Sequence, residues 1–86
     1  MNVNERILKA LANRRRLTIV SYLKRHRRST VGNLADMLKV SLPTASKHLA
    51  ILAGADIVDN EHLSLLVYYR LSDSLPALAR SILSHL

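Results

Sequence analysis

The stretch Val31–Leu52, VGNLADMLKVSLPTASKHLAIL, has the pattern of two short helices joined by a tight connection. Apolar residues recur at helical spacing in each half: Leu34, Ala35 and Leu38 in the first, and Ala45, Leu49 and Leu52 in the second. Each helix therefore has one side that can be buried and one side that faces solvent. The rest of the chain is interpreted around this pair.

The second of these helices has the surface expected of a DNA recognition helix. Ser41 stands where an N-cap belongs, and Pro43 falls in the first turn, where a missing N–H costs nothing. The outward side then carries Thr44, Ser46 and Lys47. Short polar and basic groups at the exposed start of a helix suit contact with base edges in the major groove. On this helix alone, a face that is merely solvated is an equal alternative, so the context has to decide.

Composition and charge describe one basic domain. The 86 residues suffice for a single modest core, which has to be aliphatic because the chain has no Phe and no Trp. The formal net charge of +7 favours a polyanionic partner. Nine of the thirteen Lys and Arg residues lie in residues 1–28: Arg6, Lys9, Arg14, Arg15, Arg16, Lys24, Arg25, Arg27 and Arg28. Since three of the six acids are Asp56, Asp59 and Glu61, the first half is expected to form the positive face.

Several classes of protein are disfavoured by what the sequence lacks. Without cysteine there can be no disulfide, thiolate metal site or cysteine nucleophile. No apolar run has membrane-spanning length, and Arg6 and Lys9 interrupt the apolar start that a signal peptide would need. We therefore expect a single domain over residues 1–86, located in the cytoplasm and without a membrane partner.

Periodicity and capping residues predict the order of elements. Asn13 and Thr30 are expected to cap the second and third helices. The expected elements are helices over residues 4–12, 14 to about 27 and 31 to about 39, the recognition helix after Ser41 as far as Gly54, strands Ile57–Glu61 and Leu66–Leu71 around a turn at His62–Leu65, and a last helix from Ser72 or Asp73 to Leu86.

The last of these helices carries an apolar stripe that is wide for a solvated terminal helix. Its members are Leu75, Leu78, Ile82 and Leu86, with Ala79 and Leu83 alongside. The stripe either covers the core of its own chain or forms a seam between two copies. Because both edges of the stripe are rich in leucine, we favour the seam.

The order helix, helix, helix, recognition helix, β-hairpin, helix is that of a winged helix-turn-helix, a mainly α fold with a small hairpin, the wing. The residues go further and resemble the ArsR/SmtB family of bacterial and archaeal repressors. The similar segments are Leu11–Leu17 (LANRRRL), Val31–Ala35 (VGNLA), Ser41–Leu52 (SLPTASKHLAIL) and Val67–Leu71 (VYYRL). They extend over nearly the whole chain, with Asn33 in place of the family's usual acid.

This resemblance implies a homodimer that binds double-stranded DNA in a sequence-specific way and releases it in response to an effector. By position it places Ser41, Leu42, Pro43, Thr44, Ser46 and Lys47 against DNA. His48 either joins them or is a half-buried residue that orients the helix. We add Arg15 and Arg16, from the basic first half, to the DNA-binding residues. Dimerisation through the first and last helices would use Ile7, Leu11, Leu75, Leu78, Ile82 and Leu86.

The family's metal sensors do not fit this sequence. A thiolate sensor needs cysteine. The family's sensor on the last helix needs a histidine two positions after an aspartate, and further ligands near the end of the helix. Here Leu75 stands two positions after Asp73, and only His85 lies near the end. The other histidines fall in separate elements, whereas zinc needs three or four ligands. We expect no metal and no other cofactor, and the sequence does not identify an effector.

The expected function is therefore a DNA-binding transcriptional regulator, acting as a repressor and not as an enzyme. Two recognition helices would enter successive major grooves about 34 Å apart. The wing, with Asn60–Leu65 where the family has Arg and Gly, is expected to bind DNA weakly. The alternative is a protein-interaction module that uses this acidic, leucine-bearing wing and no DNA. An RNA-binding winged helix is disfavoured because this chain has few aromatic residues for stacking on bases. An enzyme is disfavoured because the chain has no Ser/His/Asp grouping and no Gly-rich phosphate loop.

Overall fold

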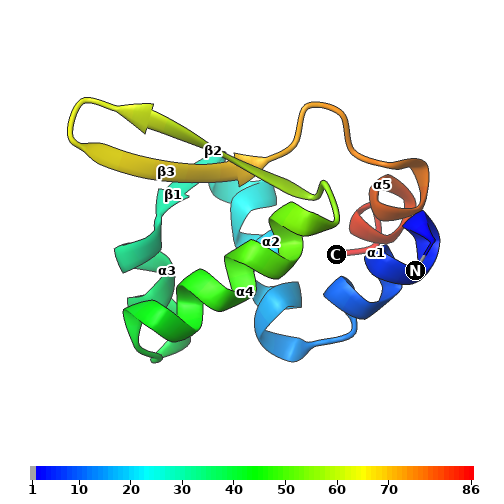
Figure 1. Cartoon of the computed structure of the whole chain (residues 1–86), viewed down its shortest axis with the longest axis horizontal. Coiled ribbons are helices and arrows are strands. Elements are labelled where there is room, and N and C mark those ends of the chain that lie inside the picture. Colours follow the sequence, from blue (N-terminus) through cyan, green and yellow to red (C-terminus); the bar gives the residue numbers. More distant parts are fainter. Residues whose placement is uncertain (1) are drawn as a thin grey trace.

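The computed structural model describes residues 2–86. Its elements, in chain order, are α1 (Val3–Leu11), α2 (Arg14–His26), β1 (Arg28–Thr30), α3 (Val31–Leu38), α4 (Leu42–Gly54), β2 (Val58–Leu63), β3 (Leu66–Leu71) and α5 (Ala77–Leu83). Figure 1 shows the terminal helices α1 and α5 packed together at one end of the molecule. The tip of the β2–β3 hairpin and the start of α4 lie at the other end.

Four helices begin at a polar residue whose side-chain oxygen accepts a hydrogen bond from the backbone N–H three residues later. These caps are Asn2 to Glu5 at 2.7 Å, Asn13 to Arg16 at 3.1 Å, Thr30 to Asn33 at 3.1 Å and Ser41 to Thr44 at 3.3 Å. Each such cap stabilises a helix by about 1 kcal/mol. The expected caps Asn13, Thr30 and Ser41 are confirmed, whereas α1 begins one residue earlier than predicted because Asn2 caps it.

The core is aliphatic, as the composition requires. The largest fully buried side chains come from α1 to α4, from the first residue of β2 and from the residue before it: Ile7, Ile19, Val20, Leu23, Leu34, Leu49, Leu52, Ile57 and Val58. The predicted buried sides of α3 and α4 are thus confirmed, with Leu38 of α3 half-buried against the core. None of the helices within residues 2–86 is long and apolar enough to cross a membrane.

The sheet has three strands and not the two that were predicted. Its order is β1-β3-β2, all antiparallel, with Ser29 opposite Tyr69 and Asn60 opposite Tyr69 on the other side. The prediction missed β1 because three residues, Arg28–Thr30, carry no alternation of apolar side chains. This strand is defined by its pairing with β3, some forty residues later in the chain.

Asn33, which replaces the acid usual in the resembling family, has a structural role beside β1. Its Nδ2 donates to the hydroxyl of Tyr22 at 2.9 Å and to Oγ of Ser29 at 2.8 Å. Ser29 is buried, so its hydroxyl needs such a partner. A carboxylate could not donate these two bonds.

The turn of the hairpin is shorter than the expected His62–Leu65. Strand β2 continues to Leu63, which pairs with Leu66, and only Ser64 and Leu65 remain as the loop. Ser64 has φ of 59° and Leu65 does not have positive φ, which is the pattern of a type II′ turn. This turn lets both strands continue to the tip.

The last helix is much shorter than predicted. It spans Ala77–Leu83, and residues 72–76 form a loop in which the backbone N–H of Ser74 donates to Oγ of Ser72. Pro76 explains the difference, because a proline disfavours helical conformation in the residue before it. Ala79 and Leu83 are buried in the core of the chain itself, so part of the expected seam covers its own protomer.

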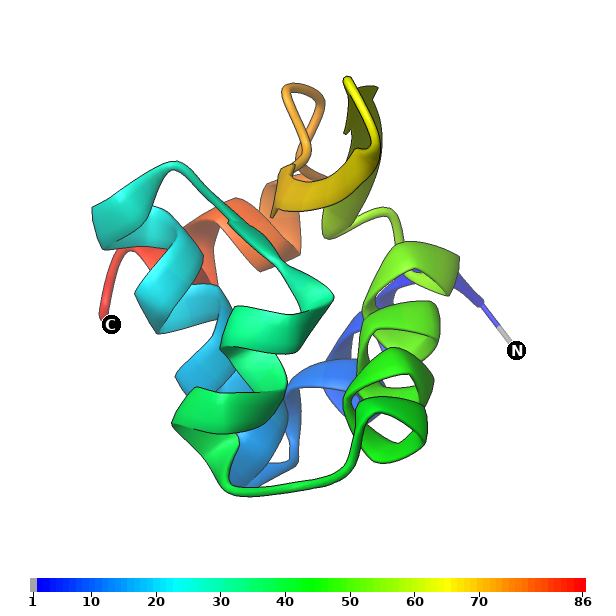
Figure 2. The ribbon, with the colours of Figure 1, turned by 90° about the vertical axis from the view of Figure 1, so that its left-hand side faces the viewer.

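The connections at both ends of α4 use left-handed residues. Lys39, between α3 and α4, has φ of 58°, and the N–H of Val40 donates to the carbonyl of Ala35, which closes the end of α3. After α4, Asp56 has φ of 60°, also in the left-handed region. Figure 2 shows α3 and α4 side by side below the hairpin.

Candidate nucleic-acid interface

Helix α4 has one face in the core and one in solvent. Ala45, Leu49 and Leu52 are fully buried, and burial of one leucine is worth about 1.5–3 kcal/mol. The outward stripe consists of Pro43, Ser46, Lys47 and Ala50, all exposed, with Leu42 beside it at 53% exposure. The structure thus places Leu42, Pro43, Ser46 and Lys47 in solvent, where a groove of DNA could receive them.

Two of the expected DNA-facing residues are partly engaged in capping α4. The hydroxyl of Ser41 accepts from the backbone N–H of Thr44 and donates to Oγ1 of Thr44 at 3.0 Å. Ser41 is exposed and Thr44 is half-buried. Their first task is therefore to start the helix, and they are less free to contact a base than Ser46.

Arg16 is not the free surface cation that the sequence suggested. Its Nε donates to the carbonyl of Ala10 at 2.6 Å, and its Nη2 donates to the carbonyl of Lys9 at 3.2 Å. Its Nη1 lies 3.2 Å from Nδ1 of His48. All three guanidinium nitrogens thus have partners within the chain, and Arg16 joins the end of α1 to the middle of α4.

His48 is half-buried, as one of its two predicted roles requires. Because a guanidinium can only donate, Nδ1 of His48 accepts and the ring is neutral. Desolvation lowers the pKa of His48 below its ordinary value of 6.5, and the positive charges of Arg16, Arg15 and Lys47 lower it further. Of the two arginines predicted to bind DNA, Arg15 is the exposed one. Arg15 and Lys47, both close enough to His48 to influence its charge, give this side of the molecule two cations free of the core.

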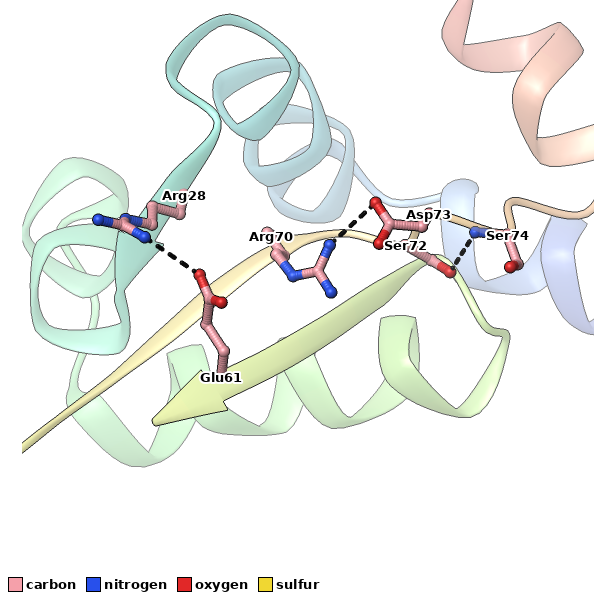
Figure 3. A network of polar contacts seen from close by, with 6 residues as sticks. All are labelled: Arg28, Glu61, Arg70, Ser72, Asp73 and Ser74. Atoms are coloured by element: carbon pink, nitrogen blue, oxygen red, sulfur yellow. Dashed lines mark hydrogen bonds and ion pairs between the residues drawn. The ribbon is translucent and has the colours of Figure 1, made fainter. Parts of the chain in front are cut away.

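One acid of the wing, Glu61, is paired with an arginine of the same sheet. Glu61 on β2 forms an ion pair with Arg28 on β1 at 3.3 Å, and the Arg28 guanidinium also lies 5.0 Å from the ring centre of Tyr68. Figure 3 shows this pair and a second one, Arg70 with Asp73 at 3.0 Å. The Asp73 carboxylate raises the pKa of Arg70, with smaller contributions from Glu61 and Asp59. The wing is therefore less acidic in effect than its sequence suggests.

The tip of the wing is apolar. Leu65 is 97% exposed, and Leu63 and Leu66 beside it are also exposed. No lysine or arginine lies between Asn60 and Leu66. A hairpin tip of this kind offers no lysine or arginine to a phosphate.

The residues predicted for dimerisation fall into two groups. Ile7 is fully buried and Leu11 is 4% exposed within the single chain, so these two do not lie on a surface where a second chain could reach them. Leu75, Leu78 and Ile82 are half-buried against the same core, and Leu86 is exposed. The exposed apolar residues of α1 are Val3 and Leu8, which the sequence analysis missed because it assigned only the inner side of that helix.

Within residues 2–86, no group of three or more His, Cys, Asp or Glu side chains is arranged to hold a metal ion. His26 stacks on Tyr22 with ring centres 4.2 Å apart, and His48 is occupied by Arg16. Asp73, which the resembling family would use as a ligand, is paired with Arg70.

Comparison with known protein families matches residues 13–60 to the bacterial regulatory proteins of the arsR family. These residues hold α2, β1, α3, α4 and the start of β2. The chain belongs to the ArsR family. The HTH-type transcriptional repressor SmtB of Mycobacterium tuberculosis is 42% identical to it over 67 residues, which are 78% of this chain and 49% of SmtB. The chain spans about half the length of this curated relative.

Solved structures of similar proteins agree with ArsR-family membership over almost the whole chain. HlyU from Vibrio cholerae superposes with a TM-score of 0.82 at 30% identity, over 96% of this chain and 86% of HlyU. The NMR structure of a fragment of Mb0332 from Mycobacterium bovis gives a TM-score of 0.82 at 28% identity, over 96% of this chain and 73% of that one. Mb0332 is described as a homodimeric winged helix-turn-helix DNA-binding domain and a possible ArsR-family regulator. The predicted winged helix-turn-helix and its family are thus confirmed for this ArsR-family chain.

Proposed function

We propose that this chain is a DNA-binding transcriptional repressor whose helix α4 enters the major groove. The observation that carries the proposal is the two-sided α4. Its core side is held by three fully buried residues, while Pro43, Ser46 and Lys47 are exposed on the opposite side. Membership in a family of bacterial regulatory proteins, and 42% identity to a transcriptional repressor, support the same function.

Within this proposal each exposed residue of α4 has a chemical task. The hydroxyl of Ser46 can donate to or accept from a base edge, and Lys47 can bind a guanine or a phosphate. Leu42 and Pro43 suit apolar contact with the methyl group of a thymine. Arg15 and the other exposed cations of α2 neutralise phosphates, which supplies affinity without sequence preference.

We further propose that the active form is a homodimer built on the end of the molecule that holds α1 and α5. This end carries the exposed Val3 and Leu8 of α1, and the exposed Leu86 follows α5 in the chain. The half-buried Leu75, Leu78 and Ile82 lie next to it, whereas Ile7 and Leu11 support it from within the core. The similar Mb0332 domain is homodimeric. Two copies would present two α4 helices to successive grooves, about 34 Å apart.

Selection of bound duplexes from a random DNA pool at physiological salt tests this function. A dimer of this kind predicts enrichment of an inverted repeat, with half-site centres about 10 base pairs apart or a multiple of that. Sedimentation of the same protein at micromolar concentration, with Leu8→Glu as the variant, tests the dimer. Failure to enrich any sequence would contradict the function, and a parent chain that sediments as a monomer would contradict the dimer.

The alternative function, protein interaction through the wing, keeps one supporting observation. Leu63, Leu65 and Leu66 form an exposed apolar tip. The acidic part of that hypothesis is weaker, because Glu61 is paired with Arg28. If selection from the random pool enriches nothing, the apolar tip is the next surface to test.

A further inference from the structure

We propose that Arg16 and His48 form a positioning pair that sets the place of the recognition helix relative to α1, and that neither residue binds DNA. This inference rests on the proposed function, since positioning has a consequence only if α4 binds a groove. It reverses the role that the sequence suggested for Arg16, and for His48 it selects the second of the two roles that the sequence left open. The argument follows from where the hydrogen-bonding groups of Arg16 point.

The first part of the argument concerns the end of α1. The last carbonyls of a helix have no partner within the helix, and they form its negative end. Arg16 donates to two of them, Ala10 at 2.6 Å and Lys9 at 3.2 Å. Its position is also fixed through its own backbone, because the N–H of Arg16 donates to Oδ1 of Asn13 at 3.1 Å. The guanidinium is therefore held by α1 and by the start of α2 before it reaches α4.

The second part concerns the contact with α4. His48 lies one residue from the buried Leu49 and one residue from the exposed Lys47. It sits where the core side of α4 meets the outward stripe. The bond from Nη1 of Arg16 to Nδ1 of His48, at 3.2 Å, restrains rotation of α4 about its own axis. Such a rotation would move Ser46 and Lys47 away from a base edge while the hydrophobic contacts adjusted.

The third part concerns charge. A cation that binds phosphate needs N–H donors directed at solvent, whereas Arg16 is only partly exposed and uses three of its five N–H donors, one on each nitrogen, within the chain. The adjacent Arg15 is exposed and has no such bonds among the interactions of the described residues. Arg15 is thus the matched control for a cation that can bind phosphate.

Replacement of each arginine by lysine separates the two roles. Lysine keeps the charge and can still bind phosphate, but it cannot donate to three separated acceptors in one plane. We expect Arg16→Lys to weaken binding to a duplex enriched by the parent by about tenfold, since a misplaced helix loses base contacts. Binding to a random duplex of equal length, which depends on charge, should stay within about twofold of the parent. Arg15→Lys should leave both affinities within about twofold.

Two replacements of His48 test the hydrogen bond from Arg16, because one of them can still accept it and the other cannot. Asparagine places its amide oxygen close to the position of Nδ1 and can accept the bond from Arg16, whereas alanine cannot. We therefore expect His48→Ala to lose about tenfold on the enriched duplex and His48→Asn to keep most of the affinity. This pair of variants also tests the proposal if Arg16→Lys proves too unstable to measure.

The pH profile of binding distinguishes a positioning histidine from one that contacts DNA. The charged groups around His48 are Arg15 and Arg16 from α2 and Lys47 of α4, and α1 contributes only carbonyls, through Arg16. When His48 is protonated it can no longer accept from Arg16, so the parent's affinity for the enriched duplex should fall as the pH approaches the lowered pKa of His48, which lies below 6.5. His48→Asn should lack this fall. A histidine that contacted phosphate would instead strengthen binding at low pH.

Three results would overturn the proposal: Arg16→Lys binding like the parent, His48→Asn as weak as His48→Ala, or an affinity that rises at low pH through His48. If no duplex is enriched by the parent, the proposed function fails by itself. In that case ¹H–¹⁵N NMR of the free protein still tests the pair. We expect a proton on Nε2 and none on Nδ1 of His48 at neutral pH, and a proton on Nδ1 would contradict the contact.

Discussion

The start of helix α4 and the wing tip lie at the same end of the molecule (Figure 1). Two of the three leucines of α4 are buried, whereas the three leucines of the wing tip are exposed. In α4, Leu49 and Leu52 face the core and are fully buried, and small polar and basic residues face solvent. In the wing tip, Leu63, Leu65 and Leu66 face solvent. The period of the secondary structure and the distance from the core decide burial, and the residue type alone does not.

Charge follows the same division. Lys47 and Arg15 beside α4 are exposed cations, whereas the wing's Glu61 is paired with Arg28 in its own sheet. DNA binding should therefore depend on α4 and hardly on the wing tip. The predictions below compare equivalent residues in these two regions.

The largest difference is expected for one leucine from each region. Leu49→Ala leaves a cavity in the core and should lower the free energy of unfolding by about 2–5 kcal/mol. Leu65→Ala removes a side chain that is 97% exposed, so it should change that free energy by less than about 0.5 kcal/mol. Denaturant unfolding of both variants measures the two values. Equal losses would mean that the wing tip is packed against something in solution.

The next largest difference concerns DNA affinity. Ser46→Ala and Lys47→Ala should each weaken binding to an enriched duplex by roughly 1–3 kcal/mol if each loses a base contact. Leu65→Ser, in the wing tip, should leave the affinity unchanged. Fluorescence anisotropy with a labelled duplex gives all three values, and circular dichroism checks that each variant is folded. A loss confined to Leu65→Ser would assign the binding surface to the wing.

A third comparison uses two serines in special backbone positions. Ser41→Ala removes the N-cap of α4 and should lower stability by about 1 kcal/mol. Ser64 has φ of 59°, which is unfavourable for an L residue, so Ser64→Gly should raise stability by up to about 1 kcal/mol. Thermal unfolding provides the measurement. A stabilising Ser41→Ala would show that the cap contributes nothing in solution.

The smallest expected effect is the pH dependence of stability through His48, because this side chain is only half-buried. Its pKa is lowered in the folded chain, so the unfolded chain binds more protons as the pH falls. Stability should be at its full value above the ordinary pKa of 6.5 and should decrease below it. His48→Asn should remove this part of the decrease, and an unchanged pH profile would contradict it.

The parts of the fold that depend on local sequence could be predicted. A cap such as Thr30 and the apolar period of α4 act within a few residues, so they can be read from the chain directly. Strand β1 could not be predicted, because Arg28–Thr30 becomes a strand only by pairing with β3. The shortened α5 follows from Pro76, which marks its start, whereas the apolar stripe extends across the proline and by itself predicts a longer helix.

The residues of the candidate site also divide into those whose place follows from local sequence and those whose role depends on a distant part of the chain. The exposed Ser46 and Lys47 follow from helical period alone. The task of Arg16 depends on His48, 32 positions later in the chain, and no local pattern connects the two. An arginine in a basic segment predicts contact with DNA, whereas the hydrogen-bond partners of Arg16 in the fold are two carbonyls and an imidazole.

The most direct test of the central claim, that α4 and not the wing tip binds DNA, is an amide NMR titration of the chain with an enriched duplex. The backbone amides of Leu42, of residues 44–47 and of Arg15 should show the largest changes in chemical shift or line width, since Pro43 has no amide N–H. Residues 63–66 of the wing tip should change little. Changes concentrated in residues 63–66, with α4 unaffected, would contradict the account.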